Sequence, residues 1–214
     1  MQKKTEISFA FIGLLFSGAT AYFAYSIGSE QVRAAKIQYK PIFVFKKEYT
    51  KDHEKDVYIT EYFSIENQGY PILTFKAVLD TVLTLKATNY IGKPLSKVTY
   101  YPIGYFTGQS SSSGGKGQLS MFIGDKNLSL MSDFINEVDS FNDKNSGKTI
   151  INHTTNTIIK ISYIDVNDEH HDKYFIDEKP VDVNVYNKLK SQIEDMNALR
   201  KKDLKLFELL SHNE

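Results

Sequence analysis

A single apolar run near the N-terminus most constrains what this chain can fold into. The run at 7–27 reads ISFAFIGLLFSGATAYFAYSI, and no charged residue lies between Glu6 and Glu30. An α-helix needs about 20 mainly apolar residues to cross a bilayer. The run therefore predicts a transmembrane helix at 7–27, preceded by a short N-terminal tail at 1–6.

Two other interpretations of this run stay open. Lys3 and Lys4 precede an apolar stretch that contains an A-x-A sequence at Ala19–Ala21, as a cleaved signal peptide does. The apolar character continues past that sequence, which favours a retained anchor, and a buried core helix is the third interpretation. We therefore expect a single-pass protein of the cell membrane.

The side of the membrane that carries the rest of the chain stays open. Orientation follows the difference in Lys and Arg between the two flanks of a span. Both flanks of this run are basic, through Lys3, Lys4, Arg33, Lys36 and Lys40. Residues 28–40 are mostly good helix formers that end at Pro41, so they predict a helical stalk between the run and the next domain.

The remaining chain predicts one mainly β domain. The sequence holds 14 Tyr and 14 Phe, and aromatic and β-branched residues favour strands. At Val57–Glu66 apolar and polar residues alternate with a period of two, which indicates a strand with one buried face. Several such strands predict a sandwich-like antiparallel domain at 41–180, with a turn at Asn67, Gln68 and Gly69.

Three further segments complete the predicted fold. Residues 108–117 read GQSSSSGGKG and predict a flexible, solvated loop. At 127–141 apolar residues recur every three or four positions, which predicts an amphipathic helix. The segment 184–210 predicts a C-terminal amphipathic helix whose broken heptad pattern favours docking on the domain, with self-association and an exposed partner helix as alternatives.

Two stretches carry a resemblance to a known group of proteins. The first is AYFAYSIGSEQVRAAKIQYKPIFVF followed by YFSIENQGYPI, and the second is ISYIDVNDEHHDKYFI. Their order of apolar run, stalk, proline and strands resembles uncharacterised bacterial single-pass membrane proteins with an immunoglobulin-like β-sandwich. The resemblance implies that fold and a membrane location, and it implies no reaction and no functional residues.

Composition excludes several functions. The 26 basic and 26 acidic side chains give a formal net charge of zero, so the chain has no overall positive field to attract nucleic acid. The absence of Cys excludes disulfides, thiolate catalysis and zinc sites built on Cys. We therefore expect no nucleic-acid partner.

Candidate chemical motifs are weak. Gly115 and Lys116 do not form a P-loop, because the required upstream Gly and the following Ser or Thr are missing. His170 and His171 lie among Asp168, Glu169 and Asp172, but neighbouring residues on an extended chain point to opposite faces and do not easily share a metal. The segment containing Asp165, Asn167 and Asp168 lacks the Gly and distal Glu of a calcium loop.

The sequence therefore assigns no catalytic, cofactor-binding or metal-binding residue and no cofactor. It predicts a membrane-anchored, non-enzymatic protein that presents a β-sandwich surface to an unknown protein partner. One alternative is an enzyme, such as a metal-dependent hydrolase, whose site assembles from distant loops. Another is a structural subunit that forms a homo-oligomer through the anchor or the C-terminal helix.

Overall fold

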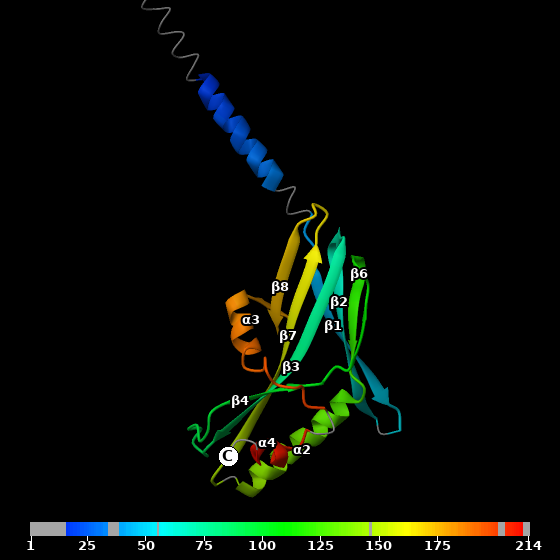
Figure 1. Ribbon diagram of the computed structural model, residues 1–214, viewed down its shortest axis with the longest axis vertical. Coiled ribbons are helices and arrows are strands. Elements are labelled where there is room, and N and C mark those ends of the chain that lie inside the picture. The colour runs from blue at the N-terminus through cyan, green and yellow to red at the C-terminus, as the bar shows by residue number, and fades with distance from the viewer. Residues whose placement is uncertain (1–15, 34–38, 55, 146, 201–203, 212–214) are drawn as a thin grey trace, which may run out of the picture. The chain divides into compact units, whose positions relative to one another are not determined.

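The computed structural model describes residues 16–33, 39–54, 56–145, 147–200 and 204–211 (Figure 1). The chain divides into two compact units, 1–40 and 41–214. In the first unit, residues 16–33 form a helix whose large side chains, such as Phe16, Tyr22 and Tyr25, are exposed. This helix includes residues 28–33 of the predicted stalk, while 34–38 lie outside the described residues.

The transmembrane prediction requires correction. None of the helices in the described ranges combines the length and the apolar character that a membrane span requires. The described helix at 16–33 ends with the polar residues Glu30, Gln31 and Arg33, so its apolar part is shorter than the roughly 20 residues that a span needs. The predicted membrane helix, single-pass topology and membrane location are therefore wrong on this finding; residues 1–15 lie outside the described residues.

The second unit contains two antiparallel sheets. One has the strand order β1-β2-β6-β5 and the other the order β4-β3-β7-β8-β9. The bounds are β1 Phe43–Asp52, β2 Val57–Ile72, β3 Thr74–Thr88, β4 Thr99–Ile103, β5 Gly108–Ser111, β6 Gly115–Ile123, β7 Ile150–Ile164, β8 His170–Ile176 and β9 Lys179–Val181. The prediction of a mainly β, antiparallel, two-sheet domain is confirmed.

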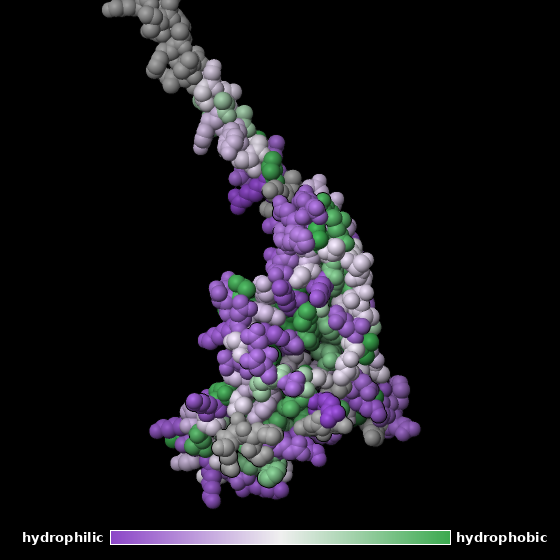
Figure 2. Space-filling view, in the orientation of Figure 1, coloured by the Kyte–Doolittle hydropathy of each residue, from purple (hydrophilic) through white to green (hydrophobic). Residues whose placement is uncertain are grey.

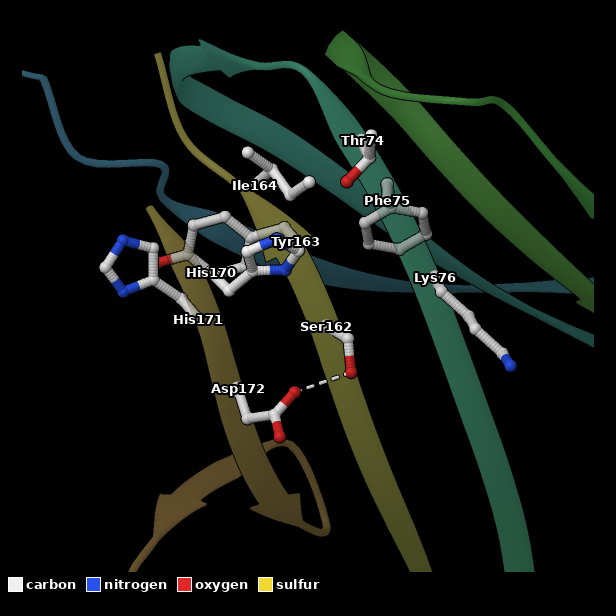
Figure 3. Close-up of a pocket in the computed structure, with 9 residues that line it drawn as sticks. All are labelled: Thr74, Phe75, Lys76, Ser162, Tyr163, Ile164, His170, His171 and Asp172. Carbon is white, nitrogen blue, oxygen red and sulfur yellow. Dashed lines mark hydrogen bonds between the residues drawn. The ribbon is translucent and has the colours of Figure 1, made fainter. Parts of the chain in front are cut away.

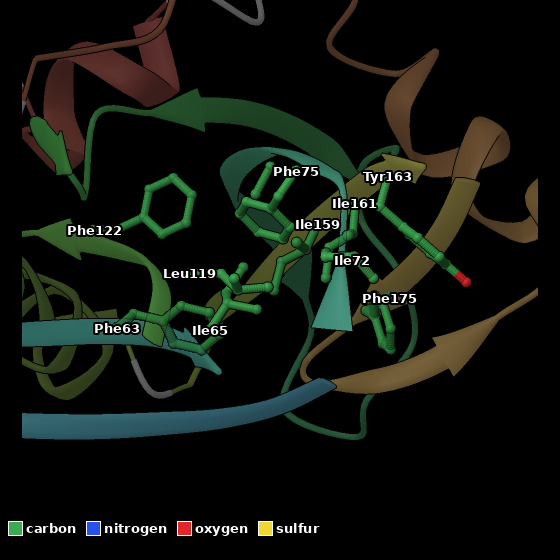
Figure 4. Close-up of a cluster of buried hydrophobic side chains, with 11 residues drawn as sticks. Phe63, Ile65, Ile72, Phe75, Leu119, Phe122, Ile159, Ile161, Tyr163 and Phe175 are labelled. Carbon is green, nitrogen blue, oxygen red and sulfur yellow. The ribbon is translucent and has the colours of Figure 1, made fainter. Parts of the chain in front are cut away.

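The main core lies between the two sheets (Figure 4). Phe63 and Ile65 of β2 pack with Phe75 of β3 and with Ile159 and Ile161 of β7, and all five are at most 8% exposed. In β2 and in β7 the two residues are two positions apart, so they point to one face. The alternation in the sequence therefore produces the two inner faces of the sandwich.

Three helices cover the parts of the five-stranded sheet that the smaller sheet leaves open. α2 (Asn127–Asn145) and α4 (Leu206–Ser211) pack on one part of the sheet through Phe134, Val138, Leu206 and Leu209. α3 (Val183–Lys190) covers the opposite face, where Tyr186 contacts the cluster of Val82 and Ile158. The predicted helix at 127–141 is confirmed and continues to Asn145.

The predicted turn at 67–69 is wrong, because β2 continues through it. Asn67 is 1% exposed. Its Oδ1 accepts the N–H groups of Ile42 and Gly69 at 3.1 and 3.0 Å, and its Nδ2 donates to the carbonyls of Tyr70 and Gly115 at 2.7 and 3.0 Å. The amide therefore joins the start of β1, an irregular part of β2 and the start of β6.

Residues 108–117 do not form the predicted loop. They supply β5, a short connection and the start of β6. A Cβ at Gly114 would lie 2.7 Å from the carbonyl oxygen of Leu73 and 2.8 Å from that of Ile72. The small glycine therefore lets this hairpin lie directly against the backbone at the point where the chain passes from β2 to β3.

The single C-terminal helix predicted at 184–210 is also wrong. α3 ends before Ser191, whose N–H bonds back to the carbonyl of Asn187, and α4 begins only at Leu206. Between them Leu199 exchanges backbone hydrogen bonds with the β4 region, donating to Pro102 at 2.8 Å and accepting from Gly104 at 2.9 Å. Residues 201–203 of this connection lie outside the described residues.

Candidate interaction surface

The position of α2 is fixed at its first residue. Asn127 is fully buried, and its Oδ1 accepts the N–H of Glu61 in β2 at 2.8 Å and that of Leu128 at 3.0 Å. The preceding residue, Lys126, donates its N–H to the hydroxyl of Thr60 at 3.1 Å. Phe134 and Val138, one turn apart and 1% exposed, then direct the apolar face of the helix to the sheet.

The short helix α4 depends on side chains from other elements. Its first N–H, at Leu206, donates to Glu137 Oε2 of α2 at 3.0 Å, so a carboxylate satisfies a free N–H at the helix start. The hydroxyl of Tyr101 in β4 donates to the carbonyl of Leu209 at 2.8 Å. Leu206 and Leu209 are buried at 4% and 2% exposure. α4 is therefore held against α2 and the end of the sheet.

A groove of about 490 Å³ runs between α2 and α4, and we call it the α2–α4 groove. Phe141, Leu206 and Leu210 provide its apolar lining, and Phe207 at its edge is 83% exposed. A second cavity of about 440 Å³ lies next to it and shares Phe141 and Leu210. The cluster beneath these helices is therefore only partly closed to solvent.

The charged lining of the groove is slightly acidic. It consists of two exposed carboxylates and one exposed amine of α2, namely Asp133, Glu137 and Lys144. Hydrophobic and hydrophilic surface lie side by side at the end of the domain that carries these helices (Figure 2). An apolar floor with a negative rim is suited to apolar side chains that basic residues flank.

The histidine-containing segment forms the β7–β8 hairpin at the other end of the domain (Figure 1). His171 stacks on Tyr163 with ring centroids 5.0 Å apart. Its neighbour His170 pairs across the strands with Ile164. Both line a depression of about 460 Å³ with Ser162 and Asp172 (Figure 3).

Asp172 belongs to a polar pair on the outside of the sheet. Its carboxylate accepts hydrogen bonds from Lys160 Nζ at 2.8 Å and from the Ser162 hydroxyl at 2.6 Å, and these hold the pKa of Asp172 below its usual range. Asp168 lies at the tip of the hairpin with φ 63. Among the residues that the structure describes, His170, Asp168 and Asp172 belong to no group of closely spaced ligand atoms with His171.

Another polar cluster, centred on Glu61, lies beside the main core. The hydroxyl of Tyr105 donates to Glu61 Oε2 at 2.8 Å, and Lys47 Nζ lies 4.0 Å from Glu61 and 2.8 Å from Glu178. Burial raises the pKa of Tyr105, with the Glu61 charge as a further cause. The phenol therefore stays protonated and serves as a hydrogen-bond donor to a nearly buried carboxylate.

The comparisons with known proteins add no family to this description, since the chain matches neither a protein-family model nor a curated protein. The sequence also gives no direct signal for the α2–α4 groove, because the groove needs the docking of α4. The Leu206, Leu209 and Leu210 spacing is the one local hint, and alone it predicts only a helix face.

Proposed function

We propose that this protein is a non-enzymatic binding module that holds a segment of a partner protein in the α2–α4 groove. The observation that carries the proposal is Phe207, a large aromatic side chain that is 83% exposed beside an apolar groove. Exposed apolar surface with a polar rim is characteristic of interaction sites. Aromatic residues in such positions contribute a large share of binding energy.

We also propose that the domain is immunoglobulin-like. The support is its strand order: β1-β2-β6-β5 has the sequence order of the A-B-E-D sheet, and β4-β3-β7-β8-β9 that of the opposing C-F-G sheet with one added strand at each edge. α2 then occupies the connection between the E-like and F-like strands. Immunoglobulin-like domains serve many functions, so the fold alone does not decide this one.

The groove favours one kind of occupant. Its lining accepts apolar side chains, and its charged lining residues, two carboxylates (Asp133 and Glu137) and one amine (Lys144), sum to −1. A cationic, amphipathic segment would bury its apolar face against Phe141 and Leu210 and place its Lys or Arg residues near Asp133. Charge complementarity of this kind increases association rates and selects partners.

The test uses a labelled amphipathic helical peptide with Leu on one face and Lys on the other. We expect the full chain to bind it, and Phe207→Ser to weaken binding about tenfold, as the loss of roughly 1.4 kcal/mol of apolar contact would. Because Phe207 is exposed, its replacement should change unfolding by less than about 0.5 kcal/mol. Fluorescence anisotropy and thermal melts measure the two quantities.

Val185→Ser is the matched control, because Val185 is 51% exposed on α3, on the opposite face of the sheet. It should leave peptide affinity unchanged. A matched peptide with Glu in place of Lys should bind more weakly. Equal affinity of the Phe207 and Val185 variants would contradict the proposal. Self-association that Phe207→Ser abolishes would instead identify a second copy of this chain as the occupant.

A further inference from the structure

We propose that the tip of the β7–β8 hairpin binds a divalent transition metal through Asp165, Glu169 and His171. One ligand atom from each residue lies within 4.8 Å of the others. His171 Nε2 is 3.0 Å from Asp165 Oδ2 and 3.9 Å from Glu169 Oε2. Two ligands of a tetrahedral zinc ion, each about 2.0–2.1 Å from the metal, are about 3.3–3.5 Å apart, so only small shifts are required.

Asp165 is already held in the orientation that a ligand needs. Its Oδ1 accepts the N–H groups of Asn167 and Glu169 at 2.8 and 3.1 Å, which directs Oδ2 to His171. Backbone bonds between Asp165 and Glu169 at 3.0 Å and between Asp168 and Asp165 at 3.1 Å close the turn. Hydrogen bonds that fix a ligating carboxylate are the usual support of a metal site.

His171 is oriented independently of Asp165. Its ring stacks on Tyr163 of β7 with an interplanar angle of 27°. Tyr163 is 6% exposed and belongs to the main core, so the imidazole rests on a fixed surface. The three ligands therefore come from a closed turn and a packed strand pair.

The charges of the site favour a cation. In the described part of the chain, no Lys or Arg forms an ion pair with Asp165 or Glu169, and both carboxylates lie close to His171. Two carboxyl groups without a Lys or Arg partner are suited to a divalent cation.

The kinds of ligand atom in the site determine which metal it prefers. One imidazole and two carboxylates suit zinc and neighbouring transition metals, whereas magnesium and calcium prefer sites made of oxygen alone. Three protein ligands leave a position for water or for a ligand from another molecule. This site lies on the opposite end of the domain from the α2–α4 groove and does not depend on the proposed function (Figure 1).

Calorimetric titration of the chelator-treated full chain tests the proposal, with ZnCl₂ as the probe and MgCl₂ as the comparison. We expect one zinc ion per chain and no heat from magnesium. His171→Asn and Glu169→Gln should each weaken zinc binding at least tenfold. His170→Asn, a change of the neighbouring imidazole, should leave it unchanged.

Two results would overturn the proposal. One is the absence of zinc binding by the unaltered chain. The other is equal affinity of the His170 and His171 variants, which would indicate binding elsewhere. Glu169 is 65% exposed in its side chain, so Glu169→Gln should preserve the fold and give a clear result even if His171→Asn loses its stacking on Tyr163.

Discussion

Replacement of Asn67 by Ala is expected to lower the free energy of unfolding by about 3–4 kcal/mol. The change removes four hydrogen bonds and leaves two N–H groups and two carbonyls without their partner in a site where Asn67 is 1% exposed. Each buried polar group left unsatisfied costs about 1–3 kcal/mol, and partial access of water to the site reduces the sum. Chemical denaturation measures the change.

Asn89→Ala is the matched control for this prediction. Asn89 Oδ1 also accepts two backbone N–H groups, from Ile91 and Lys93 at 3.2 and 2.8 Å, but these bonds are exposed. Water replaces them in the variant, so we expect a loss below about 1 kcal/mol. Similar losses in the two variants would show that Asn67 does not join β1, β2 and β6 in the way described.

Gly124→Ala is expected to destabilise the domain by about 2–3 kcal/mol. A Cβ at this position would overlap Nδ2 and Cγ of Asn127. Asn127 is fully buried and holds the N–H of Glu61, so its amide moves away only by giving up the bond that fixes α2 to β2. Overpacking of this kind usually costs about 1–3 kcal/mol. Thermal and urea unfolding measure the effect.

A double-mutant cycle separates this overlap from a general effect of Ala. In an Asn127→Ala background the overlapping amide is absent, so Gly124→Ala should then cost less than about 0.5 kcal/mol, with a coupling of about 2 kcal/mol. Gly147→Ala is the second control, because a Cβ there would meet no atom within 4 Å. Additive losses at Gly124 and Asn127 would contradict the predicted overlap.

The regular parts of the fold could be predicted because local patterns determine them. The alternation in β2 buries Phe63 and Ile65, and the spacing in α2 buries Phe134 and Val138. The turn prediction at Asn67 was wrong. Asn and Gly tolerate positive φ and so indicate a turn, whereas here the Asn67 side chain replaces backbone partners inside an irregular strand. That outcome depends on Ile42 and Gly115, which are distant in sequence.

The C-terminal segment shows a different limit. Tyr186 and Ile193 have the spacing of one helix face, and both are buried in the same cluster. Ile193 reaches it after α3 has ended, through a turn in which its N–H bonds to the carbonyl of Lys190 at 3.0 Å. Apolar spacing reports contact with the sheet and cannot distinguish a continuous helix from a helix followed by turns.

The candidate sites were predictable only in part. The local sequence predicts that His171 and Glu169 lie in one hairpin. It indicates Asp165 only as part of an incomplete calcium loop. The distance of 3.0 Å between Asp165 and His171 arises from the register of β7 and β8. The α2–α4 groove needs Glu137 and Tyr101 to hold α4 in place, which no local pattern indicates.

Mapping the amphipathic Leu and Lys peptide on the protein by amide chemical-shift perturbation tests the central claim most directly. We predict that the largest shifts fall on α2 residues from Asp133 to Asn145 and on Leu206 to Leu210, which line the groove. The amide chemical shifts of β7 and β8 residues near His171 should not change. Shifts that are absent, or that spread over the strands and spare α2 and α4, would contradict the α2–α4 groove as the binding surface.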